Sequence, residues 1–317
     1  MLKVKVKAKR EIAQDICAFE LVDHLGQALP RFTAGAHIDV HIPGNYVRQY
    51  SLCNSSDESH RYVIAVLRES ASRGGSTAMH RLQEGAMLQI NPPKNHFPLD
   101  HDAPHSILVA GGIGLTPLLS MANELAASGR SFELHYCVRS RSKLAFRDQL
   151  DDSRFRSRTS IHIDEELDSH FDAAKTFLHN KDREAHVYVC GPSGFIEYVL
   201  KCAREAGYPE ARLHREYFGA ADTQSTQDDG PFTLQIASTG QTVSVASGES
   251  AVAALARHGI EVPVSCEQGV CGTCVTRICS GVPLHRDLFL TDEEHLANDR
   301  FTPCCSRSIS PILVLDL

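Results

Sequence analysis

The sequence has no long hydrophobic run and no clustered basic segment, and each absence excludes a class of protein. It also has no internal repeat. No stretch of 18 apolar residues occurs among the 317, so no membrane span is expected. The lack of a basic cluster, together with a formal net charge of −7, argues against nucleic-acid binding. A chain of this length also exceeds one ordinary core, so we expect two or three domains.

The first residues, MLKVKVKAKREIAQ, lack the apolar segment of a secretory signal. They alternate instead, with Leu2, Val4 and Val6 on one face and lysines on the other, which predicts a strand. We therefore expect a cytoplasmic protein whose cysteines do not form disulfides.

Cysteine is abundant, because the chain has 11, an odd number that must be sorted by spacing. Cys266, Cys271 and Cys274 follow the pattern C-x4-C-x2-C, which is the spacing of plant-type [2Fe–2S] ferredoxins. Gly269 and Gly272 lie in the same loop, where small residues let the backbone wrap a cluster and direct N–H groups at its sulfurs. A zinc site is the alternative, but zinc sites usually combine two close pairs of ligands, which this spacing does not supply.

The fourth ligand must come from later in the chain, where Cys304 and Cys305 are both candidates. The segment between Cys274 and Cys304 has 29 residues, the separation found between the third and fourth ligands of plant-type ferredoxins. We therefore predict Cys304 as the ligand and Cys305 as a buried thiol that points away. Cys279 lies in the strand-like run VTRICSG and is interpreted as a packing residue.

The chain divides into three blocks that differ in their expected pattern of strands and helices. Residues 1–100 contain short alternating runs separated by turns, which predicts an antiparallel barrel or sandwich. Residues 101–222 alternate strands with helices, which predicts a parallel α/β sheet; in the helix TPLLSMANELAASG, Thr116 is expected to cap, Pro117 to lie in the first turn and Gly129 to end it. A polar segment at 221–230 is interpreted as a linker, and residues 231–317 contain strands, one helix and the cysteine-rich loop.

Two glycine-bearing loops predict a nucleotide site in the α/β block. Residues 111–117, GGIGLTP, follow a buried strand and open a helix, so the backbone and the positive helix end can approach a pyrophosphate. A tight strand–helix turn without a ligand is the alternative, because this is not a full G-x-G-x-x-G. The second loop, Cys190-Gly191-Pro192, ends another strand, and Cys190 is placed either against a nicotinamide or simply in the core.

The second strand of this block ends in Val138-Arg139-Ser140-Arg141. An acidic residue at this position would favour NADH, whereas an arginine can accept a 2′-phosphate. The residues by themselves therefore leave NADH and NADPH open.

The barrel block contains Arg48-Gln49-Tyr50-Ser51. Arginine can pair with a phosphate, tyrosine can lie against a planar ring and serine can hydrogen-bond a ring nitrogen, although an ordinary strand could have the same residues. Residues 74–76, GGS, precede a helix-like segment and resemble a second anion-binding loop.

Taken together, these motifs resemble the phthalate dioxygenase reductase family of the ferredoxin–NADP reductase superfamily, and especially the reductase components of vanillate O-demethylases. The resemblance rests on RQYSLCN, RGGSTAMH, PPKNHFPL, AGGIGLTP, HYCVRS, VYVCGPSGF, HREYF and the cysteine motif with its HRD segment, which span nearly the whole chain. It implies a flavin-binding antiparallel β-barrel (1–100), an α/β parallel-sheet NAD(P)H domain (101–222) and a β-grasp [2Fe–2S] ferredoxin domain (231–317).

The resemblance also assigns roles. It implies FMN as the flavin and NADH as the donor of a reductase that passes hydride to FMN. Single electrons then go through [2Fe–2S] to a Rieske-type oxygenase that acts on an aromatic acid, in a transient complex. Because a shuttle that docks transiently needs no oligomer, we expect a monomer. The residues expected to be catalytic are Ser51, Cys190 and Phe218. Those expected to bind cofactors are Arg48, Gln49, Tyr50, Ser51, Val66, Arg73, Gly74, Gly75, Ser76, Gly111, Gly112, Gly114, Thr116, Pro117, Arg139, Ser140, Cys190, Gly191, Pro192 and Phe218, and the cluster ligands are Cys266, Cys271, Cys274 and Cys304.

Two other functions fit these motifs less well. A flavin oxidase or oxygenase that needs no partner would require a substrate domain, for which three modules leave no room. A redox sensor without turnover would not need complete flavin and nucleotide motifs.

Overall fold

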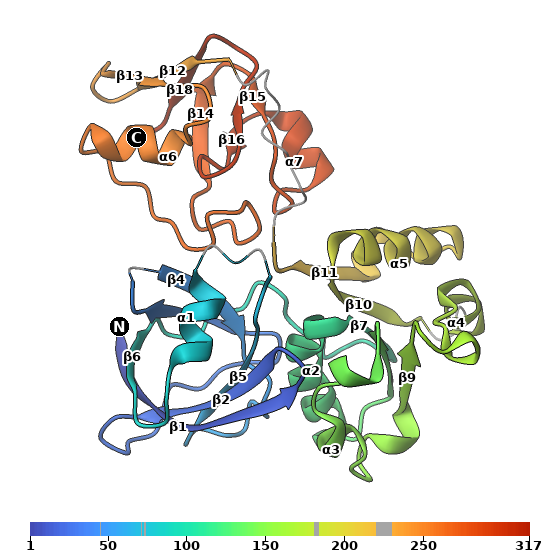
Figure 1. Cartoon of the computed structure of the whole chain (residues 1–317). Helices are drawn as coiled ribbons and strands as arrows, with labels where there is room; N and C mark the ends of the chain where they lie inside the picture. Colours follow the sequence, from blue (N-terminus) through green and yellow to red (C-terminus); the bar gives the residue numbers. More distant parts are fainter. Residues whose placement is uncertain (45, 71, 73, 181–183, 220–229) are drawn as a thin grey trace. The chain divides into compact units, whose positions relative to one another are not determined.

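A computed structural model describes residues 1–44, 46–70, 72, 74–180, 184–219 and 230–317 (Figure 1). The chain forms two compact units, Met1–Phe218 and Gly219–Leu317. Arg73 and most of the predicted linker lie outside the described residues. Within the described part, no helix has both the length and the hydrophobicity needed to cross a bilayer.

The first part of unit one is an antiparallel sheet of six strands in the order β4-β3-β6-β1-β2-β5. The strands are β1 (Leu2–Ala13), β2 (Ile16–Asp23), β3 (His37–Ile42), β4 (Tyr46–Ser51), β5 (Tyr62–Leu67) and β6 (Met87–Ile90), with helix α1 (Gly75–Arg81) between the last two. A bridge between Leu52 and Ile64 joins the two edge strands, which closes the sheet into a barrel. Val4 and Val6 are fully buried in its core, so the alternation predicted for the first strand is confirmed.

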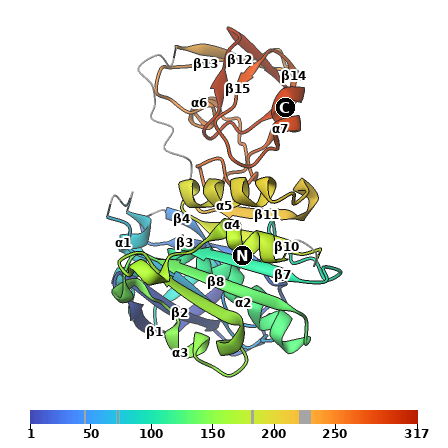
Figure 2. The same ribbon diagram turned by 90° about the vertical axis from the view of Figure 1, so that its right-hand side faces the viewer.

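The second part is a parallel sheet in the order β11-β10-β7-β8-β9. It comprises β7 (Ser106–Gly111), β8 (Phe132–Val138), β9 (Thr159–Ile163), β10 (His186–Gly191) and β11 (Leu213–Tyr217), with helices α2 (Leu115–Ala127), α3 (Arg147–Leu150), α4 (Ala173–Asn180) and α5 (Ser193–Glu205). Short 3-10 turns occupy Gly112–Gly114, Arg141–Lys143, Arg156–Arg158, Leu167–Ser169 and Glu210–Arg212. Figure 2 shows α2 on one face of this sheet and α5 on the other.

The strand order reverses between β7 and β10, because the chain builds outward on one side to β9 and then returns to the other side of β7. In open parallel sheets, ligands bind outside the carboxyl ends of the strands at such a switch point. The loops after β7 and β10 are the two glycine-bearing loops of the sequence.

The expected start of α2 needs one correction. Thr116 does not cap the helix, because a 3-10 turn leads directly into α2 and the Thr116 hydroxyl donates to the carbonyl of Ile113 at 3.0 Å. Pro117 does lie in the first turn, and Gly129 follows the helix with φ +67°, a left-handed conformation that favours glycine.

Unit two is a five-stranded mixed sheet in the order β13-β12-β18-β14-β16 with a small β15-β17 pair. Its elements are β12 (Phe232–Ile236), β13 (Thr242–Val245), α6 (Ala251–Arg257), β14 (Thr276–Ser280), β15 (Pro283–Leu284), α7 (Asp292–Ala297), β16 (Arg300–Phe301), β17 (Arg307–Ser308) and β18 (Ile312–Leu315). Helix α6 is capped by the Ser250 side chain and buries Ala254 and Leu255 in the core. The parallel pairing of β12 with β18 and the single packed helix are those of a β-grasp fold.

The packing role predicted for Cys279 is wrong. Thr276 and Ile278 point into the core, so the alternation of β14 places Cys279 on the exposed face.

Candidate functional site

The two loops at the switch point touch through their backbones. A Cβ on Gly114 would lie 2.2 Å from the carbonyl oxygen of Cys190, and one on Gly191 would lie 2.9 Å from the Cα of Gly111. Neither position can therefore accept a side chain without moving the loops apart. Gly112 has φ +55°, and Pro192 precedes α5. The sequence-predicted residues of both loops are thus brought together at one sheet edge.

The start of α2 adds the remaining residues predicted for this loop. Its first turn contains buried Thr116 and Pro117, and the helix follows β7 after a single 3-10 turn, Gly112–Gly114. The N-terminal end of a helix favours an anion, because the helix dipole is positive there.

The barrel places Arg48 beside the loop of residues 74–76. A Cβ on Gly75 would lie 2.8 Å from Nε of Arg48, and one on Gly74, with φ +99°, would clash with the Tyr46 hydroxyl. The Arg48 guanidinium lies over the Tyr46 ring at 5.5 Å and donates to the carbonyl of Val47 at 2.7 Å. It forms no ion pair with a carboxylate of the described residues, so its charge is available to a phosphate.

The other predicted barrel residues lie around this strand. Tyr50 is half-buried, and burial raises the pKa of its phenol well above the usual range. The Gln49 side chain points the other way, as strand alternation requires, and donates to Asp39 at 3.1 Å. Val66 is buried in the barrel core, and Ser76 hydrogen-bonds the Ser72 hydroxyl at 2.9 Å.

Ser51, at the end of β4, meets the α/β sheet through a residue that sequence reasoning missed. Its hydroxyl donates to the Glu216 carboxylate at 3.4 Å. Glu216 lies directly beside Cys190, because β10 and β11 pair in parallel with these two residues in register. Removal of water around the carboxyl raises the pKa of Glu216 to about 8, and burial raises the pKa of the Cys190 thiol.

The only sequence signal for Glu216 was its place in HREYF, at the carboxyl end of a strand and two residues before Phe218. Phe218 itself is 39% exposed at the end of unit one. Ser51, Cys190 and Glu216 together form a polar group at the edge of the sheet, where a planar ligand could be hydrogen-bonded.

Residues predicted to distinguish the donors lie beyond β8. The carbonyl of Arg139 accepts a bond from Glu165 N at 3.2 Å, and Ser140 hydrogen-bonds Ser142 at 2.9 Å. Arg141 forms a bidentate ion pair with Glu166. The acidic residues that follow β9 therefore lie beside the arginines that follow β8, an arrangement that the sequence did not reveal because the two segments are far apart in the chain.

The cysteine loop of unit two brings its sulfurs together. The thiol of Cys266 lies close enough to that of Cys271 to shift its pKa, and the thiols of Cys274 and Cys304 influence each other in the same way. The first three are buried and Cys304 is half-buried. Gln268 N donates to the Cys266 sulfur at 3.3 Å, as expected for a loop that directs N–H groups at a cluster. Four convergent thiols, three from one loop and the fourth from a distant turn, match the ligand pattern of a plant-type [2Fe–2S] cluster rather than the two close ligand pairs usual for zinc.

Gly269 and Gly272 both have left-handed backbones, with φ +72° and +68°. A Cβ on Gly269 would lie 2.4 Å from the Cys305 sulfur, and one on Gly272 would meet the Phe289 ring at 2.2 Å, so the loop closes only with glycine. Cys305 is half-buried rather than buried, and its sulfur lies 3.2 Å from the Thr302 hydroxyl. The prediction of a buried thiol that points away is therefore wrong in both parts, because Cys305 is half-buried and its sulfur lies against Gly269 of the cysteine loop.

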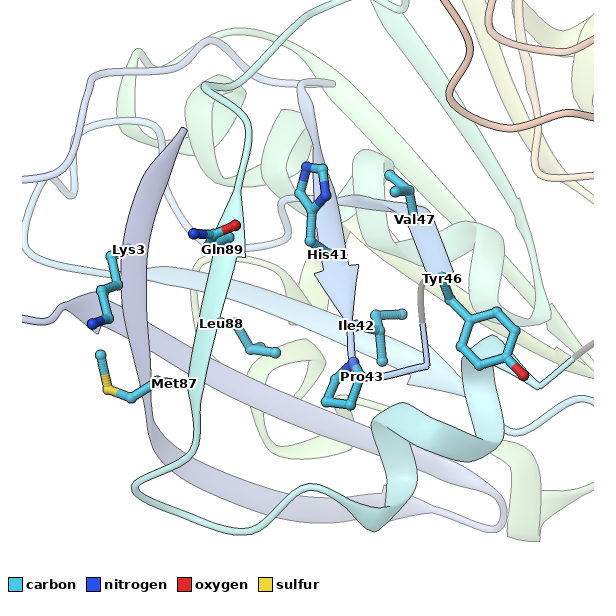
Figure 3. Close-up of a pocket in the computed structure, with 9 residues that line it drawn as sticks. All are labelled: Lys3, His41, Ile42, Pro43, Tyr46, Val47, Met87, Leu88 and Gln89. Atoms are coloured by element: carbon cyan, nitrogen blue, oxygen red, sulfur yellow. The ribbon is translucent and has the colours of Figure 1, made fainter. Parts of the chain in front are cut away.

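A separate pocket of 510 Å³ opens on the barrel (Figure 3). It is lined in part by Lys3, His41, Tyr46 and Met87, and by none of the residues predicted for the cofactors. Tyr46 and Val47, which line the pocket and both contact Arg48, connect it with the Arg48 region.

Comparisons with known proteins agree with this geometry. Residues 234–308 match the 2Fe-2S iron-sulfur cluster binding domain, and residues 108–201 match the oxidoreductase NAD-binding domain. The chain is 51% identical over 319 residues to a vanillate O-demethylase oxidoreductase of Pseudomonas putida, with all of both chains covered. It is 42% identical to the phthalate dioxygenase reductase of Burkholderia cepacia, over 100% of this chain and 97% of that one.

Solved structures give the same picture. A phthalate dioxygenase reductase, described as a modular structure for electron transfer from pyridine nucleotides to [2Fe–2S], matches with a TM-score of 0.79 and 41% identity, over 100% of this chain and 98% of that one. An intact type IV self-sufficient cytochrome P450 monooxygenase matches with a TM-score of 0.83 and 36% identity, over 100% of this chain and 41% of that one.

Proposed function

The chain belongs to the family of the vanillate O-demethylase oxidoreductases and phthalate dioxygenase reductase, and we propose that it is the NADH-dependent reductase component of a Rieske-type aromatic-acid oxygenase or O-demethylase system. The observation that supports this most is the hydrogen bond from Ser51 to Glu216, which lies beside Cys190 at the switch point. There, a flavin on the barrel and a nicotinamide on the sheet would share one crevice.

When bound, FMN accepts a hydride from NADH, and the [2Fe–2S] cluster carries one electron at a time. The residues of the chain bind and orient these groups, and proximity supplies much of the rate. Arg48, Gly75 and Ser76 would hold the flavin phosphate, Tyr50 would lie against the ring, and Ser51 would hydrogen-bond a ring nitrogen. Gly74 would shape the same site, to which Arg73 is also assigned. Val66 lies in the barrel core and the Gln49 side chain donates to Asp39, so these two would support the strands that form the site.

On the sheet, Gly111, Gly112, Gly114, Thr116 and Pro117 would hold the pyrophosphate at the start of α2. Cys190, Gly191 and Pro192 would place the nicotinamide, and Phe218 would exclude water from the flavin ring. Glu216 would hold the Ser51 hydroxyl and keep a proton on its carboxyl near neutral pH, because its pKa is raised to about 8.

The choice of NADH over NADPH is supported by the acidic residues after β9. Glu166 neutralises Arg141, so a 2′-phosphate would find less positive charge there than the arginines alone suggest. Arg139 and Ser140 would face the ribose.

The cluster would be held by Cys266, Cys271, Cys274 and Cys304, in a domain spanning 231–317, after a flavin domain at 1–100 and a nucleotide domain at 101–222. The partner would be a terminal oxygenase that docks transiently, since the names of the relatives refer to demethylase and dioxygenase systems. A monomer in the cytoplasm is sufficient for this role.

Turnover of NADH with ferricyanide or cytochrome c as the electron acceptor tests the proposal. We expect rapid turnover with NADH and a slower rate with NADPH. Absence of turnover with both donors, in protein that contains flavin and iron, would favour a redox sensor instead.

A further inference from the structure

The HRD segment, residues 285–287, has no role in the function proposed above, yet Asp287 is one of the most deeply buried charged groups in unit two. Its side chain is 0% exposed. Two histidines flank the carboxylate: His295 Nε2 lies 3.3 Å and His285 Nδ1 3.7 Å from the same oxygen, Oδ1. The two imidazole rings stack with their centroids 4.3 Å apart.

On one side, the Asp287 segment is fixed to the loop that bears three cysteines. Leu288 N donates to the carbonyl of Gly269 at 3.0 Å, in the middle of that loop. The contact is close, because a Cβ on Gly269 would lie 3.0 Å from the Cα of Asp287. The second carboxylate oxygen, Oδ2, accepts a bond from Leu290 N at 2.8 Å, which holds the turn that makes this contact.

On the other side, the carboxylate reaches the turn that bears Cys304. The Ser306 hydroxyl donates to Asp287 Oδ1 at 3.4 Å and accepts a bond from Arg286 N at 3.1 Å. Ser306 is itself fixed to Thr302 twice, through its backbone N at 2.9 Å and through its hydroxyl at 2.9 Å. Asp287 and its neighbours therefore connect the two chain segments that supply the four cysteines, which are far apart in sequence.

We propose that Asp287 is a positioning residue for the iron–sulfur cluster, which ties the three-cysteine loop to the Cys304 turn and lowers the reduction potential through its buried negative charge. This inference rests on the proposed function, because it requires that the cysteines hold a cluster. Groups just outside the ligands of a metal site orient those ligands and tune the metal. A buried charge is poorly screened, and reduction adds one negative charge to the cluster, so the carboxylate disfavours the reduced form.

The test compares Asp287→Asn with Asp292→Asn, which removes an exposed carboxylate from the same unit. Three quantities are measured on the full chain as purified: iron per chain, the rate of cluster loss in the presence of a chelator, and the midpoint potential of the cluster followed by EPR. We expect Asp287→Asn to lose its cluster roughly 10-fold faster or more, and to have a higher potential with an altered EPR signal. Asp292→Asn should match the unsubstituted chain in all three.

Ser306→Ala keeps the inference testable if Asp287→Asn fails to assemble a cluster. It removes one hydrogen bond of the link but no charge, so cluster loss should be faster than in the unsubstituted chain. Unchanged loss rates and potential in Asp287→Asn, or an unchanged loss rate in Ser306→Ala, would overturn the inference.

Metal analysis decides whether Asp287 instead belongs to a second metal site. The ligand atoms of His285, Asp287 and His295 lie within 4.8 Å of one another, a spacing that a divalent cation could also use. One equivalent of a metal other than iron, lost in Asp287→Asn but not in Asp292→Asn, would overturn the positioning role in favour of a second metal site. An unsubstituted chain without iron or a cluster spectrum would instead contradict the proposed function itself.

Discussion

The raised pKa of Glu216 makes a prediction about stability that can be tested without any acceptor or partner. The carboxyl has a pKa of about 8 in the folded chain against an ordinary value of 4.5, because its surroundings exclude water. Between these two pH values the folded chain keeps a proton that the unfolded chain has released. The free energy of unfolding therefore falls as the pH rises across this range, by roughly 1.4 kcal/mol for each pH unit.

Across the whole range this amounts to roughly 5 kcal/mol as an upper value, and to a few kcal/mol in practice, because the Glu216 side chain is only half-buried. Glu216→Gln mimics the protonated carboxyl and cannot ionise. At pH 5 the variant and the unsubstituted chain should have nearly equal stability. Above pH 8 the variant should be the more stable of the two by most of that amount.

The assay is denaturant unfolding of flavin-free protein between pH 5 and 9, followed by circular dichroism, since the chain has no tryptophan. Glu205→Gln is the matched control, because Glu205 is an exposed glutamate of the same unit. Its stability difference from the unsubstituted chain should not change with pH. If the difference for Glu216→Gln also stayed constant from pH 5 to 9, the carboxyl would ionise normally and the reasoning about its burial would be refuted.

Three further predictions concern the cofactor sites. Cys304→Ser should abolish the cluster absorption and leave flavin reduction by NADH intact, whereas Cys305→Ser should retain the cluster; the opposite pattern in visible spectra would assign Cys305 as the ligand. Arg48→Ala should weaken FMN binding by roughly 10- to 100-fold in a fluorescence titration, since a charged hydrogen bond contributes about 1.5–3 kcal/mol, and unchanged affinity would exclude a phosphate contact. Arg139→Ala should alter the ratio of kcat/KM for NADH to that for NADPH, and an unchanged ratio would remove this residue from the ribose site.

Much of the fold could be predicted from the sequence, because the local spacing of apolar residues indicates where strands and helices lie. Alternation placed Val4 and Val6 in the barrel core, and the glycine loops after β7 and β10 were identified as one crevice from the rules of parallel sheets. The cysteine spacing likewise predicted a convergent group of thiols, because a single tight loop supplies three of them.

What the sequence could not give depends on contacts between distant segments. Glu216 becomes significant only when β11 pairs with β10 in the register that places it beside Cys190 and under Ser51. Cys279 was predicted to be a packing residue because it lies in a strand-like run, but the alternation of β14 points its side chain toward solvent. Thr116 resembled an N-terminal cap by residue type and position, but the helical conformation already begins before it, in the 3-10 turn Gly112–Gly114.

The most direct test of the proposed function is an anaerobic visible spectrum of the purified chain before and after one equivalent of NADH. The account predicts flavin absorption with a broad iron–sulfur shoulder, both of which bleach promptly when NADH is added. A spectrum without flavin, or one that dithionite bleaches but neither NADH nor NADPH does, would contradict it.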